Sequence, residues 1–165
     1  MKKAKYSASE VAKAIIYNYI LKQKADFIPE NLLEFPTQLK LQKLLYFVQA
    51  AFLSLLNYPA FNEEIEAWQH WPVVPEIFYE FKRYKNYPII LNLKDLKKVY
   101  KKFTKKEKDL ISFINKIFWK YSALKLVEIT HKHEPWRKAY EWWYKKISKK
   151  TLQSYYKSLF EFEVI

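Results

Sequence analysis

The side chains best suited to chemistry in this sequence are two histidines, His131 and His133, which stand two positions apart between Glu128 and Glu134. Imidazoles and carboxylates together can bind a metal ion or move a proton. The spacing matches no zinc-binding signature, and side chains two positions apart on a helix point about 200° away from each other. We therefore predict no metal site, and expect both histidines to cap or hydrogen-bond where one helix ends and Pro135 begins the next.

Other catalytic arrangements have little support. An acidic cluster is formed by Glu63, Glu64 and Glu66, but no histidine or nucleophile lies at a sequence spacing that indicates a catalytic pair with it. Cysteine is absent, which excludes thiol nucleophiles, disulfides and cysteine-ligated metals. Glycine is absent too, and phosphate-binding loops, the dinucleotide fingerprint and the G-x-S-x-G nucleophile elbow all depend on it. We expect neither enzymatic activity nor a cofactor.

The elements that must position these residues are nearly all helices. Helical periodicity predicts a mainly α fold, with residues 1–165 forming one compact domain. Helices are predicted over residues 8–24, 38–57, 75–85, 96–103, 105–121, 122–130, 135–144 and after Ser148. The helix over 38–57 is apolar on nearly all sides, which predicts that it is the buried centre of the domain.

The stretch after this central helix does not read as helical. Polar and apolar residues alternate over 64–68, which predicts at most a short β-hairpin or an extended arm there. Pro72 and Pro75 are predicted to bracket a turn, and Pro75 suits the first position of the next helix. The apolar, uncharged stretch over 44–60 is too short and polar to span a membrane, and no signal peptide is evident. We expect a cytoplasmic protein without a membrane partner.

Charge is the most unusual property of the chain. Lys and Arg together number 30 against 17 Asp and Glu, which gives a net charge of +13. Lysine is densest between Lys94 and Lys108, and such segments release counterions from phosphate groups. A nucleic-acid-binding regulatory protein is therefore one interpretation. Against it, only Arg83 and Arg137 are arginines, the aromatic residues have core-like spacing, and no nucleic-acid-binding motif stands out.

Two separated motifs resemble the Panacea domain, the family of SocA-like and phage-associated GepA-like antitoxins. The first begins in the central helix and continues past the alternating stretch, and the second is the family's "TH…PW" signature. The resemblance covers roughly residues 11–139. The motif residues are Leu41, Gln42, Lys43, Leu44, Tyr46, Phe47, Ala67, Trp68, Pro72, Val73, Thr130, His131, Pro135 and Trp136. One departure is that the family usually has glycine where this chain has Trp71 before Pro72.

The resemblance implies an antitoxin that neutralises a cognate protein toxin by direct protein–protein binding. Members of the family neutralise very different toxins, and no catalytic residue is attached to their motifs. One member is a proteolytic adaptor that delivers its toxin to an ATP-dependent protease, so delivery is an alternative mechanism and such a protease a second partner.

A docking surface is expected in the acidic part of the chain. Residues 44–81 contain no Lys or Arg and five Glu, whereas the rest of the chain is strongly basic. Because many toxins that act on RNA are basic, the segment over 61–81 within this stretch would attract a partner that the rest repels, and its aromatic residues could anchor the interface. An alternative is that Trp68 belongs to the core. The predicted partner-binding residues are Glu63, Glu64, Glu66, Trp68, Trp71 and Tyr79.

Overall fold

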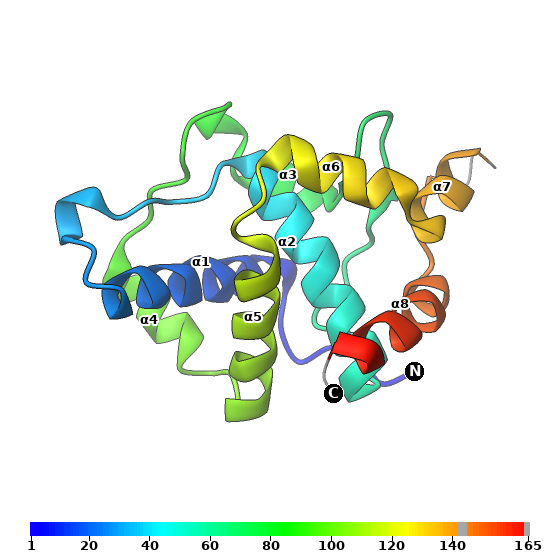
Figure 1. Ribbon diagram of the computed structural model, residues 1–165, viewed down its shortest axis with the longest axis horizontal. Helices are drawn as coiled ribbons and strands as arrows, with labels where there is room; N and C mark the ends of the chain where they lie inside the picture. Colours follow the sequence, from blue (N-terminus) through cyan, green and yellow to red (C-terminus); the bar gives the residue numbers. More distant parts are fainter. Residues whose placement is uncertain (142–144, 164–165) are drawn as a thin grey trace.

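The computed structural model describes residues 1–141 and 145–163, and Figure 1 shows that helices make up most of it. The helices are α1 (Ala8–Ala25), α2 (Gln38–Ala51), α3 (Pro75–Glu80), α4 (Leu93–Tyr100), α5 (Lys105–Phe118), α6 (Ala123–Lys132), α7 (Glu134–Glu141) and α8 (Lys149–Glu163). Short 3-10 turns lie at Glu30–Leu32 and Lys82–Tyr84. The prediction of a mainly α domain is confirmed. The predicted end of the α7 region, at residue 144, lies outside the described residues.

Helix α2 is the centre of the domain, as predicted. It packs against α1, α5, α6 and α8, and every residue from Leu41 to Ser54 is buried. The Thr37 hydroxyl accepts a hydrogen bond from the Lys40 N–H (3.3 Å) and so caps the helix. The last turn is a π-helix over Phe52–Leu56, which ends at Asn57 in left-handed backbone (φ 60°).

The central helical segment is longer than the stretch over 44–60 and is mainly apolar in composition. By these two criteria alone Gln38–Leu56 could span a membrane, contrary to the expectation above. Within the domain, however, 78% of the most apolar 18-residue stretch of this segment is buried. The core helix of a folded domain meets the same criteria, so this property follows from the central position of α2.

Side-chain caps fix most of the helix starts. The capping boxes Ser7–Glu10 and Thr104–Glu107 both form, and the Ser122 hydroxyl caps α6. Helix α4 differs from the prediction, because the Asn92 side chain caps it and starts it at Leu93 instead of Leu96.

The carboxylate of Glu107 is fully buried and joins three parts of the chain. It accepts hydrogen bonds from the Thr104 N–H, the Tyr6 hydroxyl and the Tyr58 hydroxyl, each at 2.8 Å. Lys5 Nζ lies 3.4 Å from the same carboxylate. Burial alone would raise the pKa of Glu107, but these hydrogen bonds outweigh it and lower the pKa to about 2. The N-terminal arm, the segment after α2 and the start of α5 are thus held together by one ionised group.

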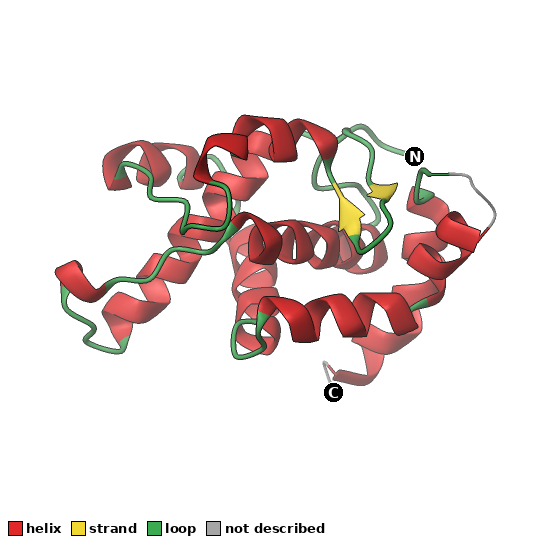
Figure 2. Cartoon of the chain, turned by 90° about the horizontal axis from the view of Figure 1, so that it is seen from above, coloured by secondary structure: helices red, strands yellow, loops and turns green. Residues whose placement is uncertain are grey.

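Strands β1 (Glu66–Ala67) and β2 (Pro72–Val73) form the short antiparallel hairpin that the alternating sequence predicted. Figure 2 shows how small it is beside the helices. The turn is closed by Trp68 and Trp71, whose N–H and C=O groups bond each other at 3.1 and 3.2 Å. The prediction of a turn between Pro72 and Pro75 is wrong, because Pro72 lies in β2 and Pro75 begins α3. Trp71 is not among the residues with positive φ, so this turn does not require glycine.

Candidate functional site

The hairpin is held from one side by two neighbouring residues of α2. The Gln42 side chain accepts from the Val74 N–H (2.8 Å) and donates to the Val74 carbonyl (3.3 Å), as a paired strand would do. Lys43 Nζ donates to the Pro72 carbonyl at 3.5 Å. Both contacts are made to the main chain of the hairpin, which explains how these two motif residues serve the fold.

The C-terminal part of the chain holds the hairpin from the other side, again through the main chain. The Ile147 N–H donates to the Ile65 carbonyl at 2.7 Å, and the next contact along β1 joins the Ala67 N–H to the Lys145 carbonyl. At the turn, the His131 imidazole bonds the His70 carbonyl. The hairpin is therefore fixed by its backbone on both sides.

Lys43 is the most unusual residue beneath the hairpin. Its side chain is completely buried, and no carboxylate of the described residues lies within ion-pair distance of it. The Trp71 ring covers the amine, with Nζ 5.0 Å from the ring centroid. Burial lowers the pKa of Lys43 well below its ordinary value, because the charged form loses its hydration.

The "TH…PW" signature builds an aromatic stack beside the hairpin. His131 stacks on Trp136 (centroids 4.0 Å apart, 18° between planes), and Trp136 stacks on Tyr140 of α7 (4.8 Å, 10°). Thr130 is buried, and its hydroxyl donates to the Val127 carbonyl at 2.9 Å. The signature thus connects α6 and α7 to the hairpin turn, because His131 stacks on Trp136 and also bonds the His70 carbonyl.

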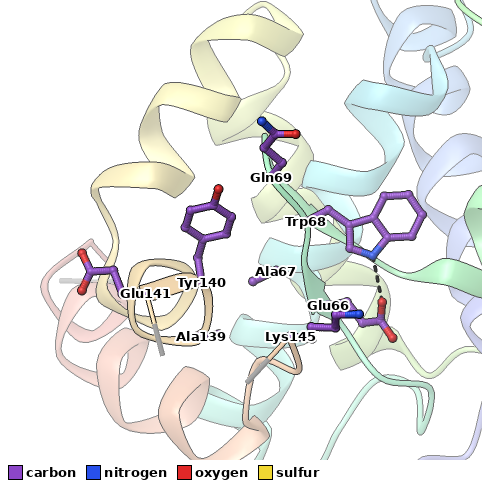
Figure 3. A pocket seen from close by; sticks show the side chains of 8 residues that line it. All are labelled: Glu66, Ala67, Trp68, Gln69, Ala139, Tyr140, Glu141 and Lys145. Atoms are coloured by element: carbon purple, nitrogen blue, oxygen red, sulfur yellow. Dashed lines mark hydrogen bonds between the residues drawn. The ribbon is translucent and has the colours of Figure 1, made fainter. Parts of the chain in front are cut away.

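A groove of about 670 Å³ lies between the hairpin and α7 (Figure 3). Its walls are mainly apolar, and two glutamates and one lysine are among its lining residues. Trp68 Nε1 donates to Glu66 at 2.8 Å, which fixes both side chains at the hairpin edge. Tyr140 is 43% exposed on the opposite side. The lining residues are Glu66, Ala67, Trp68, Gln69, Ala139, Tyr140, Glu141 and Lys145.

The structure brings only part of the predicted docking set together. Glu66 and Trp68 line the groove, and Trp71 lies at the same hairpin turn. Trp68 is half-buried and packs on the Phe78 ring (5.1 Å), so its indole contributes to packing, and in Figure 3 the ring points away from Tyr140. Tyr79 is exposed on α3, outside the groove lining.

Two of the predicted glutamates make structural contacts away from the groove. Glu63 accepts from the Ala8 N–H (3.0 Å) at the start of α1, and Glu64 lies 3.8 Å from Lys149 of α8. The contribution of α7 was missed from the sequence. Its signal was available, because Trp136 and Tyr140 have the i, i+4 spacing of neighbours on one helix face.

Both histidines of the His-x-His pair are hydrogen-bonded, as the sequence predicted. His131 contacts the hairpin, and His133 Nδ1 bonds the Tyr156 hydroxyl, which in turn bonds Tyr46 at 3.3 Å. Burial lowers the pKa of His133. Across residues 1–141 and the described part beyond them, no three or more acidic, histidine or cysteine side chains come together as a metal site would require.

The helical core, the backbone-held hairpin and the histidine–tryptophan stack make up a small, mainly α domain. The family model described as "Antitoxin SocA-like, Panacea domain" matches residues 41–137, and the chain belongs to that family. The resemblance drawn from the two motifs is thereby confirmed. No curated protein and no solved structure gives a significant match. Helices α1 and α8 lie outside the matched residues.

Proposed function

We propose that this protein is the antitoxin of a toxin–antitoxin pair and that it neutralises its toxin by binding it directly. Membership of the SocA-like Panacea family supports an antitoxin role. The observation that carries the binding mode is the groove between the hairpin and α7, because it is a preformed, largely apolar hollow beside a rigidly held turn. Rigid elements bind with a smaller loss of conformational entropy than mobile ones.

The groove favours a partner of particular chemistry. Tyr140 offers an exposed ring surface of the kind that anchors protein interfaces, and Trp68 holds Glu66 at the hairpin edge of the groove. Two glutamates, Glu66 and Glu141, line the groove with one lysine, Lys145, and residues 44–81 contain no Lys or Arg. The proposed occupant is therefore an apolar side chain of the toxin flanked by lysine or arginine. Elsewhere the +13 charge of the chain disfavours a basic partner, which restricts its docking to this face.

The test is co-expression with the product of the adjacent gene as the candidate toxin. We expect rescue of growth and a complex on size-exclusion chromatography. Tyr140→Ala should weaken the complex by about thirtyfold, a typical effect of truncating an interface anchor. Trp68→Ala should weaken it as well, because it removes the bond that holds Glu66 at the groove. Tyr87→Ala is the matched control, because Tyr87 is 73% exposed and lies outside the groove lining. Trp71→Ala is less suitable, since the Trp71 ring also covers the buried Lys43.

The same cells separate direct blocking from delivery to a protease. If binding alone neutralises the toxin, its amount stays constant while growth recovers. A toxin that disappears only in the presence of this protein and an ATP-dependent protease would favour the adaptor mechanism. Absence of both rescue and complex would refute the proposed function, and full affinity of both groove variants would place the docking surface elsewhere.

A further inference from the structure

Helix α4 carries a row of lysines along its solvent face. The row consists of Lys94, Lys97 and Lys98 of α4 and of Lys101, the C-cap residue of the helix. These four lysines follow i, i+3, i+4, i+7 spacing, and all are exposed. The opposite face of α4 packs on α1, with Leu96 fully buried there. With a helical rise of 1.5 Å per residue, a positive charge recurs about every 5 Å along this row. We call these four residues the α4 lysine row.

The α4 lysine row belongs to a larger basic region. Unlike two of its neighbours in that region, the row has no carboxylate partner among the described residues. Neighbouring Lys102 and Lys105 are paired with Glu10 (2.7 Å) and Asp109 (2.6 Å). Among the described residues, no carboxylate lies within 4.0 Å of any amine in the α4 lysine row. The one acidic residue on α4 is Asp95 in its first turn, where a negative charge favours the helix N-terminus. Four solvated ammonium groups therefore face the same direction without compensation.

The composition of this surface selects among possible ligands. A protein interface needs aromatic or aliphatic anchors, and lysine is depleted there, whereas the leucines of α4 lie on its packed side. Stable anchoring at a membrane surface takes a second signal beside the charges, such as inserted apolar side chains, and the α4 lysine row contains none. Repeated lysines without anchors suit the phosphate backbone of nucleic acid, which is bound through counterion release alone.

We infer that the α4 lysine row is a second binding surface, which binds the phosphate backbone of nucleic acid without sequence preference. The near absence of arginine in the chain agrees with backbone binding, since base-edge recognition relies largely on bidentate arginines. Figure 1 shows α4 and α7 at opposite ends of the domain, so this surface is separate from the groove. A bound partner at the groove and a strand along α4 would not compete for the same side chains.

The test measures fluorescence anisotropy of a labelled single-stranded oligothymidine of about twenty nucleotides. Four phosphate contacts predict a slope of about −3 in a plot of log affinity against log salt concentration. The variant K97E/K98E/K101E reverses three charges of the row. K116E/K120E/K157E is the matched control, because these lysines are also exposed and both variants change the net charge equally. Unchanged thermal unfolding confirms that both variants fold.

We expect the row variant to lose at least about tenfold in affinity near 100 mM salt and its slope to fall to about −1, with less than about a threefold loss in the control. Equal losses in both variants would overturn the inference, because net charge alone would then explain binding. Equal displacement by polyglutamate of the same charge would favour an acidic protein partner instead. Binding to anionic phospholipid vesicles but not to the oligonucleotide would favour a membrane surface. These outcomes leave the groove unaffected, so they are independent of the proposed antitoxin function.

Discussion

Replacing Glu107 with glutamine should destabilise the protein at neutral pH and have little effect in acid. Glu107 is buried, and its pKa falls from an ordinary 4.5 to about 2 through hydrogen bonds from Thr104, Tyr6 and Tyr58. One pKa unit corresponds to about 1.4 kcal/mol, so ionised Glu107 contributes about 3 kcal/mol at neutral pH. Glutamine keeps the shape and one acceptor oxygen, but its NH₂ group must face donors that the carboxylate now accepts from.

The pH dependence follows from the sign of the pKa change. Because the pKa of Glu107 is lower in the folded state, the contribution is complete above about pH 5 and is lost as the pH falls toward 2. The difference in unfolding free energy between wild type and E107Q should thus be about 2–3 kcal/mol near pH 7 and close progressively in acid. In thermal unfolding followed by circular dichroism, this corresponds to a midpoint roughly 5–10 °C lower at neutral pH.

Glu128→Gln provides the control for this measurement. Lys132 and Lys125 lower the pKa of Glu128 to about 2 as well, but the Glu128 side chain is 49% exposed, so water and salt screen these ion pairs. We expect E128Q to unfold nearly as the wild type at every pH. A pH-independent difference between wild type and E107Q would refute the reasoning, because ionisation of Glu107 would then not be the source of its stabilisation.

Three further predictions concern polar groups that are buried or half-buried. Lys43→Met should stabilise the protein near pH 7, because Lys43 is protonated in the unfolded chain and the folded state disfavours that charged form. Paired urea titrations should show that the gain in unfolding free energy shrinks toward about pH 10, where the unfolded chain also loses the proton. Gln42→Leu should cost about 1–3 kcal/mol in the same titrations, because it leaves the Val74 N–H unpaired, whereas the Val74 carbonyl keeps its bonds from the Ile77 and Phe78 N–H groups. An unchanged midpoint would mean that water replaces the amide. His133→Gln should remove a loss of stability that the wild type shows as the pH falls below about 6.5, since burial lowers the pKa of His133 and protonation favours the unfolded chain.

Local signals in the sequence were sufficient to predict most helices. Capping residues such as Ser7 and Thr104 act within one turn, so the pattern and the structure agree there. The apolar spacing predicted α4 from Leu96, but the helix begins at Leu93 because the Asn92 side chain caps it there. Pro72 was predicted at a turn, but it lies in β2, because proline can occupy a strand position whose N–H is not needed.

The candidate site was less predictable, because it depends on contacts between distant segments. The groove joins Trp68 of the hairpin to Tyr140 of α7, and no local pattern reports that these two residues meet. In the same way, Glu63 looked like part of an acidic docking face, but it caps a helix start at Ala8, fifty-five positions earlier. The side chains of an exposed-looking cluster can therefore be engaged by tertiary contacts that composition does not reveal.

The way the hairpin is anchored has a consequence for how this domain can change over generations. Three side chains anchor it through main-chain groups: Gln42, Lys43 and His131. Every amino acid supplies the carbonyl groups that they bond, and every one except proline supplies the N–H. The exposed side chains at the turn, Gln69 and His70, can therefore be substituted while the backbone of the hairpin keeps its position. A library randomised at these two positions should retain folded members at high frequency. Such a scaffold can acquire a new binding specificity by changing its turn while keeping its core.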